Sequence, residues 1–199
     1  MSRSVEFFFD VGSPAAYLAW TQLPALAAAT GASVVLRPML LGGVFQATGN
    51  ASPVTVPAKA RHVFTDFARC ARRFGVPLQR NPHFPINTLV AMRAAAGVQL
   101  KTPERLDAYL RAVFEAIWVK GLNLNDPAVV AAVWAGAGFD PAALGALANE
   151  ADTKAALRAT TEEAVARGVF GAPTMFVGDE MFFGQDRLDF VREALAAGG

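Results

Sequence analysis

The stretch that decides the fold of this chain is VEFFFDVGSPAAYLAW, residues 5–20. Val5–Phe9 is a short apolar run typical of a buried strand. A helix is predicted to begin at Pro14, because proline is well tolerated in a first helical turn. Ser13 then stands at the N-terminus of that helix, where the partial positive charge favours an anion. Ser13 is therefore the first candidate for a functional residue.

Outward from this turn, the chain is predicted to complete a βαβ unit. The helix runs over Pro14–Thr30 with Gly31 as its stop, and a second strand covers Ser33–Arg37. A polar loop containing glycine and proline is expected from Leu41 to Pro57.

The middle of the chain, from about Ala58 to Arg167, is predicted to be almost entirely helical. A capping residue followed by proline marks three helix starts, at Thr102-Pro103, Asp126-Pro127 and Asp140-Pro141. One of these helices is predicted over Pro103–Lys120, from apolar residues at helical spacing.

The last part of the chain returns to strands. Thr174–Val177 and Met181–Phe183 flank a tight turn and form a predicted hairpin, and a helix over Asp186–Ala197 follows. The order βαβ, helical block, ββα indicates an α/β fold. We predict a thioredoxin-like domain of residues 1–57 and 168–199, with an inserted all-helical domain of residues 58–167.

In a thioredoxin-like fold the first strand-to-helix turn normally carries Cys-x-x-Cys. Here the two positions are Ser13 and Ala16, which cannot form a disulfide. This indicates a protein that stabilises a thiolate brought by another molecule. Ala172-Pro173 precedes the third strand, where such folds carry a cis-proline, so we predict a cis bond with the Ala172 backbone facing the ligand.

Composition narrows the class of protein. A net charge of +1 over 199 residues gives no reason to expect nucleic acid or an anionic membrane as partner. Pro24 and Gly31 interrupt the apolar stretch from Leu18 to Leu36, so a membrane span is not expected. The single cysteine, Cys70, excludes an intrachain disulfide and fits a reducing cytoplasm, and two histidines without an acidic cluster predict no metal.

Three segments carry a resemblance to a known family: Gly-Ser-Pro-x-x-Tyr-Leu-Ala from residue 12, Val-Phe-Gly-Ala-Pro-Thr from residue 169, and Phe-Gly-Gln-Asp-Arg-Leu from residue 183. Together they resemble the 2-hydroxychromene-2-carboxylate isomerases, relatives of kappa-class glutathione transferases and DsbA oxidoreductases. The resemblance covers essentially the whole chain and implies glutathione as cofactor.

The resemblance assigns the glutathione contacts to particular residues. It implies that Ser13 is the catalytic serine, hydrogen-bonded to the glutathione sulfur. Ala172 pairs with the cysteinyl backbone, beside cis Pro173, and Gln185 and Asp186 hold the γ-glutamyl end. Asp186 has a second interpretation as the capping carboxylate of the last helix.

Two further positions match kappa-class contacts to the tripeptide more loosely, because loop lengths vary there. These are Asn50 and Lys59. Lys59 has an equally good interpretation as a solvated charge on a helix. His62 follows it by one helical turn, and neither His62 nor Cys70 is given a role; Cys70 is interpreted as a buried, inert thiol.

On the substrate side, the chain departs from some isomerases of naphthalene degradation, which carry a lysine and a tyrosine where this chain has Phe45 and Ile86. This indicates a different way of holding an aromatic substrate, or a different compound. Asn87 matches a polar residue of the family and is a substrate-side candidate. Trp118 is interpreted either as an apolar wall of the site or as a core residue.

The function predicted from these features is conversion of 2-hydroxychromene-2-carboxylate to trans-o-hydroxybenzylidenepyruvate in aromatic hydrocarbon catabolism, by reversible addition of the glutathione thiolate. The alternatives are a kappa-like transferase or peroxidase and, from another class, a non-catalytic thioredoxin-like binding module. A small aromatic substrate is the expected partner, and a homodimer is possible.

Overall fold

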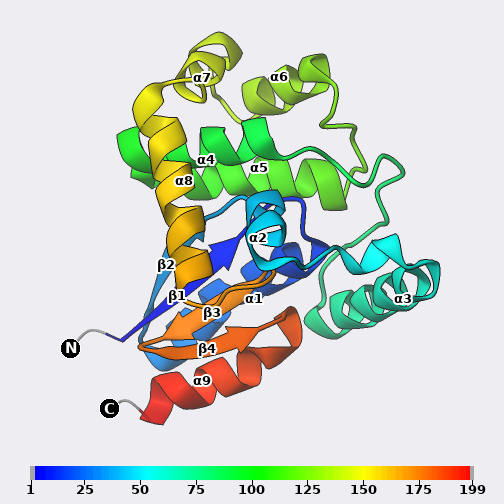
Figure 1. Cartoon of the computed structure of the whole chain (residues 1–199), viewed down its shortest axis with the longest axis vertical. Helices are drawn as coiled ribbons and strands as arrows, with labels where there is room; N and C mark the ends of the chain where they lie inside the picture. The colour runs from blue at the N-terminus through cyan, green and yellow to red at the C-terminus, as the bar shows by residue number, and fades with distance from the viewer. Residues whose placement is uncertain (1–2, 198–199) are drawn as a thin grey trace.

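The computed structural model describes residues 3–197 and contains a four-stranded mixed sheet in the order β2-β1-β3-β4 (Figure 1). β1 (Ser4–Phe9) pairs in parallel with β2 (Ser33–Pro38). β3 (Thr174–Val177) pairs antiparallel with β1 and with β4 (Glu180–Phe183). The predicted thioredoxin-like arrangement is confirmed, and the hairpin turn is one residue shorter than expected.

The two faces of the sheet are covered by different helices, and alternation along β1 decides which. Phe7 and Phe9 belong to the main core with α1 (Pro14–Thr30) and α9 (Leu188–Ala197). Phe8 points to the other face and packs in a smaller cluster with residues of α2 (Leu41–Thr48) and α8 (Ala151–Ala166). Figure 1 shows α8 crossing in front of the strands.

The prediction of a loop from Leu41 to Pro57 is wrong, because this segment contains α2 and the short 3₁₀ helix η1 (Pro53–Thr55). Its three glycines and two prolines are typical of a loop. In the structure, a Cβ on Gly43 would lie 3.2 Å from Thr161 Cγ2, so glycine lets α2 approach α8 closely. Packing of Val44 on the smaller cluster therefore overrides low helix propensity.

The central region is helical in most of its length. Its elements are α3 (Pro57–Phe74), α4 (Leu89–Lys101), η2 (Pro103–Arg105), α5 (Leu106–Trp118), α6 (Pro127–Gly136), α7 (Pro141–Leu147) and α8. Asp126 and Asp140 cap their helices by accepting hydrogen bonds from Ala128 and Ala142 N–H, as predicted. Thr102 instead precedes η2 and makes no side-chain cap.

Residues 75–88 are not helical and interrupt the region that is predicted to be almost entirely helical; the proline-rich run Asn81–Pro85 lies within them. Asn81, 2% exposed, holds this segment by donating from Nδ2 to the carbonyls of Ile117 and Leu122, both at 2.9 Å. These long-range bonds leave no pattern in the local sequence.

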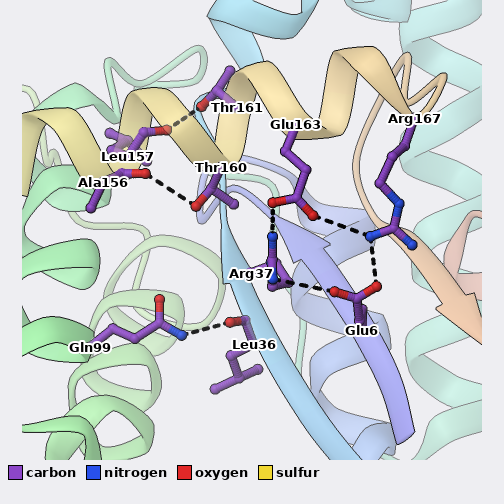
Figure 2. A network of polar contacts seen from close by, with 10 residues as sticks. All are labelled: Glu6, Leu36, Arg37, Gln99, Ala156, Leu157, Thr160, Thr161, Glu163 and Arg167. Carbon is purple, nitrogen blue, oxygen red and sulfur yellow. Dashed lines mark hydrogen bonds and ion pairs between the residues drawn. The ribbon is translucent and has the colours of Figure 1, made fainter.

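The insertion shares its core with the sheet domain: Phe9 of β1 packs on Phe114 of α5 with ring centroids 6.2 Å apart. At the far end of the insertion, α8 is tied to the sheet by a ring of charges (Figure 2). In it, Arg37 contacts Glu6 at 3.3 Å and Glu163, and Arg167 contacts Glu6 at 2.6 Å and Glu163 at 3.4 Å.

The domain boundaries at 57 and 167 stay a prediction, and the outermost predicted residues, 1–2 and 198–199, lie outside the described residues.

Within residues 3–197, no single helix has both the length and the apolar composition needed to cross a membrane. Only the pair α6 and α7, bent by 111°, meets that test together.

Candidate active site

Ser13 is the N-cap of α1 and makes two side-chain hydrogen bonds. Its Oγ accepts from Ala16 N–H at 3.1 Å and donates to the Ala172 carbonyl at 2.9 Å. The residue has the extended backbone expected of an N-cap and is 5% exposed. The hydroxyl therefore joins the two segments singled out in the sequence.

The first turn of α1 has few free amide donors. Pro14 has no N–H, Ala16 N–H is bound by Ser13 Oγ, and Tyr17 N–H is bound by the Ser13 carbonyl. The Ala15 N–H has no hydrogen-bond partner within residues 3–197. This amide, the helix dipole and the Ser13 hydroxyl together form a site for an anion.

The Ala172–Pro173 peptide bond is cis, which confirms that prediction. A second cis bond, Phe84–Pro85, was not predicted. The Pro173 carbonyl accepts from Gly184 N–H at 3.0 Å, so the segment before β3 is fixed against the end of β4.

Ser13 opens into a cleft of about 370 Å³. One of its walls is built from Phe64 and Phe67 of α3 and Phe84 of the 75–88 segment, with ring centroids 5.8–6.1 Å apart for the two pairs that include Phe64. We call these three residues the aromatic wall. Phe45 of α2 also lines the cleft. None of the three wall residues was singled out in the sequence.

Polar groups lie along another part of the cleft. Gln185 is 6% exposed and donates from Nε2 to Cys70 Sγ at 3.6 Å. Asp186 pairs with Arg187 at 2.6 Å in η3 (Gln185–Arg187). Asn50 donates from Nδ2 to the Phe170 carbonyl at 2.8 Å. Gln185, Asp186 and Asn50 all line the cleft, together with Ser13 and Ala172.

Other predicted site residues lie outside the residues that line the cleft. Lys59 is exposed on α3, as is His62, and Ile86 packs against the main core. Asn87 is exposed and accepts from Leu89 N–H at 3.1 Å. Trp118 is fully buried, and its Nε1 donates to the Val11 carbonyl at 2.8 Å, so it is a core residue behind the turn.

Asp10 is a polar residue of this region that sequence reasoning missed. It is 1% exposed and accepts three hydrogen bonds, from Gly12 N–H, Leu41 N–H and the Thr88 hydroxyl, at 2.9, 2.9 and 3.0 Å. Burial raises the pKa of the Asp10 carboxyl, and the three hydrogen bonds oppose that rise. The available signal was an acidic residue directly after the three buried phenylalanines that end β1, Phe7–Phe9.

A sheet with a helix N-terminus facing a cis-proline, and no cysteine at the turn, defines a thioredoxin-like protein without the redox pair. The sequence matches the DSBA-like thioredoxin domain family over residues 4–196. It is also 32% identical to the 2-hydroxychromene-2-carboxylate isomerase of Sphingobium xenophagum over 98% of this chain and 99% of that one. The chain belongs to the DsbA-like thioredoxin domain family and, within it, to the 2-hydroxychromene-2-carboxylate isomerases.

Two further proteins are similar over nearly the full chain. A solved structure of a 2-hydroxychromene-2-carboxylate isomerase superposes with a TM-score of 0.86 at 29% identity, covering 98% of this chain and 95% of that one. Glutathione S-transferase kappa 1 of Rattus norvegicus is 29% identical, covering 95% of this chain and 89% of that one.

Proposed function

We propose that this protein is a glutathione-dependent isomerase that converts 2-hydroxychromene-2-carboxylate to trans-o-hydroxybenzylidenepyruvate. The observation that carries the proposal is the anion site at the N-terminus of α1, where the Ser13 hydroxyl and the Ala15 N–H, which has no partner within residues 3–197, meet at one end of a cleft. Membership of the isomerase family supports the reaction, and the names of the relatives supply the substrate.

The donors at α1 fit a thiolate. When bound, glutathione would supply a thiolate that adds reversibly to the conjugated side chain of the substrate and leaves unchanged. Ser13 Oγ keeps its bond from Ala16 N–H while its proton turns from the Ala172 carbonyl to the sulfur. Ala15 N–H adds a second donor, and the helix dipole favours the anion.

The remaining contacts follow from the groups that line the cleft. The backbone of Ala172, beside Pro173, would pair with the cysteinyl backbone of glutathione. Asp186 and Gln185 would hold the ammonium end, for which Asp186 supplies the carboxylate. Asn50 lies near enough to the same cleft to contact the tripeptide, whereas exposed Lys59 is left out of this contact set.

The aromatic wall and Phe45 would hold the ring of the substrate. Apolar side chains with a few placed polar groups are typical of small-molecule sites. The expected roles of Ile86 and Asn87 as direct substrate contacts are replaced in this proposal by Phe64, Phe67 and Phe84, which line the cleft.

The test is turnover of 2-hydroxychromene-2-carboxylate with glutathione, without it, and with S-methylglutathione, which has no thiol to ionise. Turnover should require glutathione, S-methylglutathione should inhibit, and mass spectrometry should recover all glutathione unchanged. Stoichiometric conversion of glutathione into a stable thioether would overturn the proposal in favour of a kappa-like transferase, the second candidate supported by the rat relative.

A matched pair of variants tests the wall. Phe67→Ala should raise the KM for the aromatic substrate about tenfold, because it removes ring contacts worth about 0.5–1.5 kcal/mol in addition to buried area. Phe190→Ala, on α9 and 54% exposed, should not change that KM. A cytoplasmic location and a homodimer stay predictions from the sequence.

A further inference from the structure

The buried carboxylate of Asp10 accepts hydrogen bonds from two segments that lie on different sides of the cleft. Asp10 Oδ1 accepts from Gly12 N–H, which shapes the turn that presents Ser13. Asp10 Oδ2 accepts from Leu41 N–H, the first amide of α2. Leu41 and Phe45 lie one helical turn apart on α2, and both line the cleft.

A third donor fixes this carboxylate from the insertion. The Thr88 hydroxyl, at the start of α4, donates to Oδ2 at 3.0 Å. Thr88 also packs tightly on the turn, because a Cβ on Gly12 would lie 2.8 Å from Thr88 Cγ2 and 3.3 Å from Asp10 Oδ1. The turn, α2 and α4 therefore meet at one side chain that is almost completely buried.

We propose that Asp10 is a positioning residue that sets the separation between the Ser13 turn and α2, and so aligns the thiolate with the substrate ring. The proposal rests on the proposed function for the identity of the two ligands. It does not require Asp10 to touch either of them or to exchange a proton.

The chemistry of the side chain explains why a carboxylate is needed. Gly12 N–H and Leu41 N–H are both donors, and each meets a different oxygen of Asp10. Asparagine has the same shape but one acceptor oxygen, so its NH₂ group must face one of the two backbone donors. Asp10→Asn can hold the turn or α2, but not both.

The first measurement needs no ligand. Amide hydrogen exchange at Gly12 and Leu41, followed by NMR in the wild type and in Asp10→Asn, should show one of the two amides exchanging at least about tenfold faster in the variant. A folded variant in which both amides exchange as in the wild type would overturn the proposal.

The second measurement uses turnover and the absorbance of the bound thiolate. Release of Gly12 in Asp10→Asn should raise the bound thiol's pKa, and release of Leu41 should raise the KM for the aromatic substrate; either should lower kcat/KM about tenfold or more. A lower thiol pKa with both KM values unchanged would show that only the charge of Asp10 acts, and would overturn the proposal.

If Asp10→Asn does not fold, substitutions of Thr88 test the same proposal. Thr88→Val removes one donor to Asp10 and should lower kcat/KM in the same way but less, and Thr88→Ser should restore it. The matched control is Thr153→Val, a buried threonine on α8 that does not line the cleft. Equal kcat/KM in Thr88→Val and Thr153→Val would overturn the proposal. Wild-type turnover is measured first, so its absence would refute the proposed function and leave the exchange result to decide the role of Asp10.

Discussion

Ser13→Ala is the substitution that tests the anion site most directly. It removes the oxygen that accepts from Ala16 N–H and the proton that goes to the Ala172 carbonyl. The Ala15 N–H and the helix dipole remain. The variant therefore isolates the hydroxyl from the other components of the site.

Two effects of this substitution can be estimated: the loss of folding stability and the rise in the pKa of the bound thiol. Loss of the N-cap costs about 1 kcal/mol, and the partly buried Ala172 carbonyl loses its donor, so stability should fall by about 1–2 kcal/mol. For a chain of this size that is a decrease in Tm of about 2–8 °C. A hydrogen bond to a charged group contributes about 1.5–3 kcal/mol, which corresponds to a rise of about 1–2 units in the pKa of the bound thiol.

The assay is a pH titration of the bound thiolate by its ultraviolet absorbance, together with turnover at saturating glutathione. Turnover should fall on the order of 10²-fold, as for loss of one oxyanion donor. Ser13→Gly is the control, because glycine caps a helix within a few tenths of a kcal/mol of serine. It should match Ser13→Ala in thiol pKa and turnover while losing less stability. An unchanged thiol pKa in both variants, or normal turnover in Ser13→Gly, would refute the assigned role of the hydroxyl.

Three further predictions concern stability and are checked by thermal or urea unfolding. Thr153→Val should raise the free energy of unfolding by about 1 kcal/mol, because the buried Thr153 hydroxyl has no hydrogen-bond partner within residues 3–197; a decrease would contradict this. Gly97→Ala should lower it by about 1–3 kcal/mol, because the added Cβ would lie 2.7 Å from Leu147 Cγ; no loss would mean that α7 moves freely. Burial raises the pKa of folded Asp10 above its unfolded value, so its protonated form favours the folded state. The stability of the wild type relative to Asp10→Asn should therefore fall as the pH rises from about 4 through the raised pKa and level off above it; a rise over that range would contradict the direction of the shift.

Much of the fold was predictable because its signals are local. Pro14 at the first helical position and Gly31 at the end, with φ of +65°, fix the bounds of α1. The apolar run Val5–Phe9 and the turn signal after Val177 indicate the strands, although the turn has two residues, one fewer than predicted. The prediction that failed, a loop in place of α2, failed because α2 depends on contacts with a distant segment, such as Gly43 against Thr161, which leave no local pattern.

The residues of the candidate site also differ in how far the local sequence could predict them. Ser13, Ala172 and Gln185 could be selected from the sequence, and all three line the cleft, because each stands at a fixed place in a strand-to-helix or loop-to-strand connection; their contacts with glutathione stay a prediction. The aromatic wall was missed because two of its residues, Phe64 and Phe67, come from α3, and the sequence shows that a helix is amphipathic without showing what its apolar face covers; the third, Phe84, comes from the separate 75–88 segment. Ile86 illustrates the reverse error, because it was predicted to contact the substrate but packs against the main core.

The insertion has a structural role in the chemistry of the turn that follows β1. Val11 receives a hydrogen bond from Trp118 Nε1 at its carbonyl, and its N–H points to Met92 Sδ at 3.4 Å. Thr88 holds the carboxylate one residue earlier. A redox protein holds its sulfur covalently at this turn, whereas under the function we propose a sulfur from another molecule would be held by hydrogen bonds alone. Such bonds stabilise developing charge well only when the donors are fixed in advance. The helices behind the turn supply that rigidity for the two donors of the proposed anion site, the Ser13 hydroxyl and the Ala15 N–H.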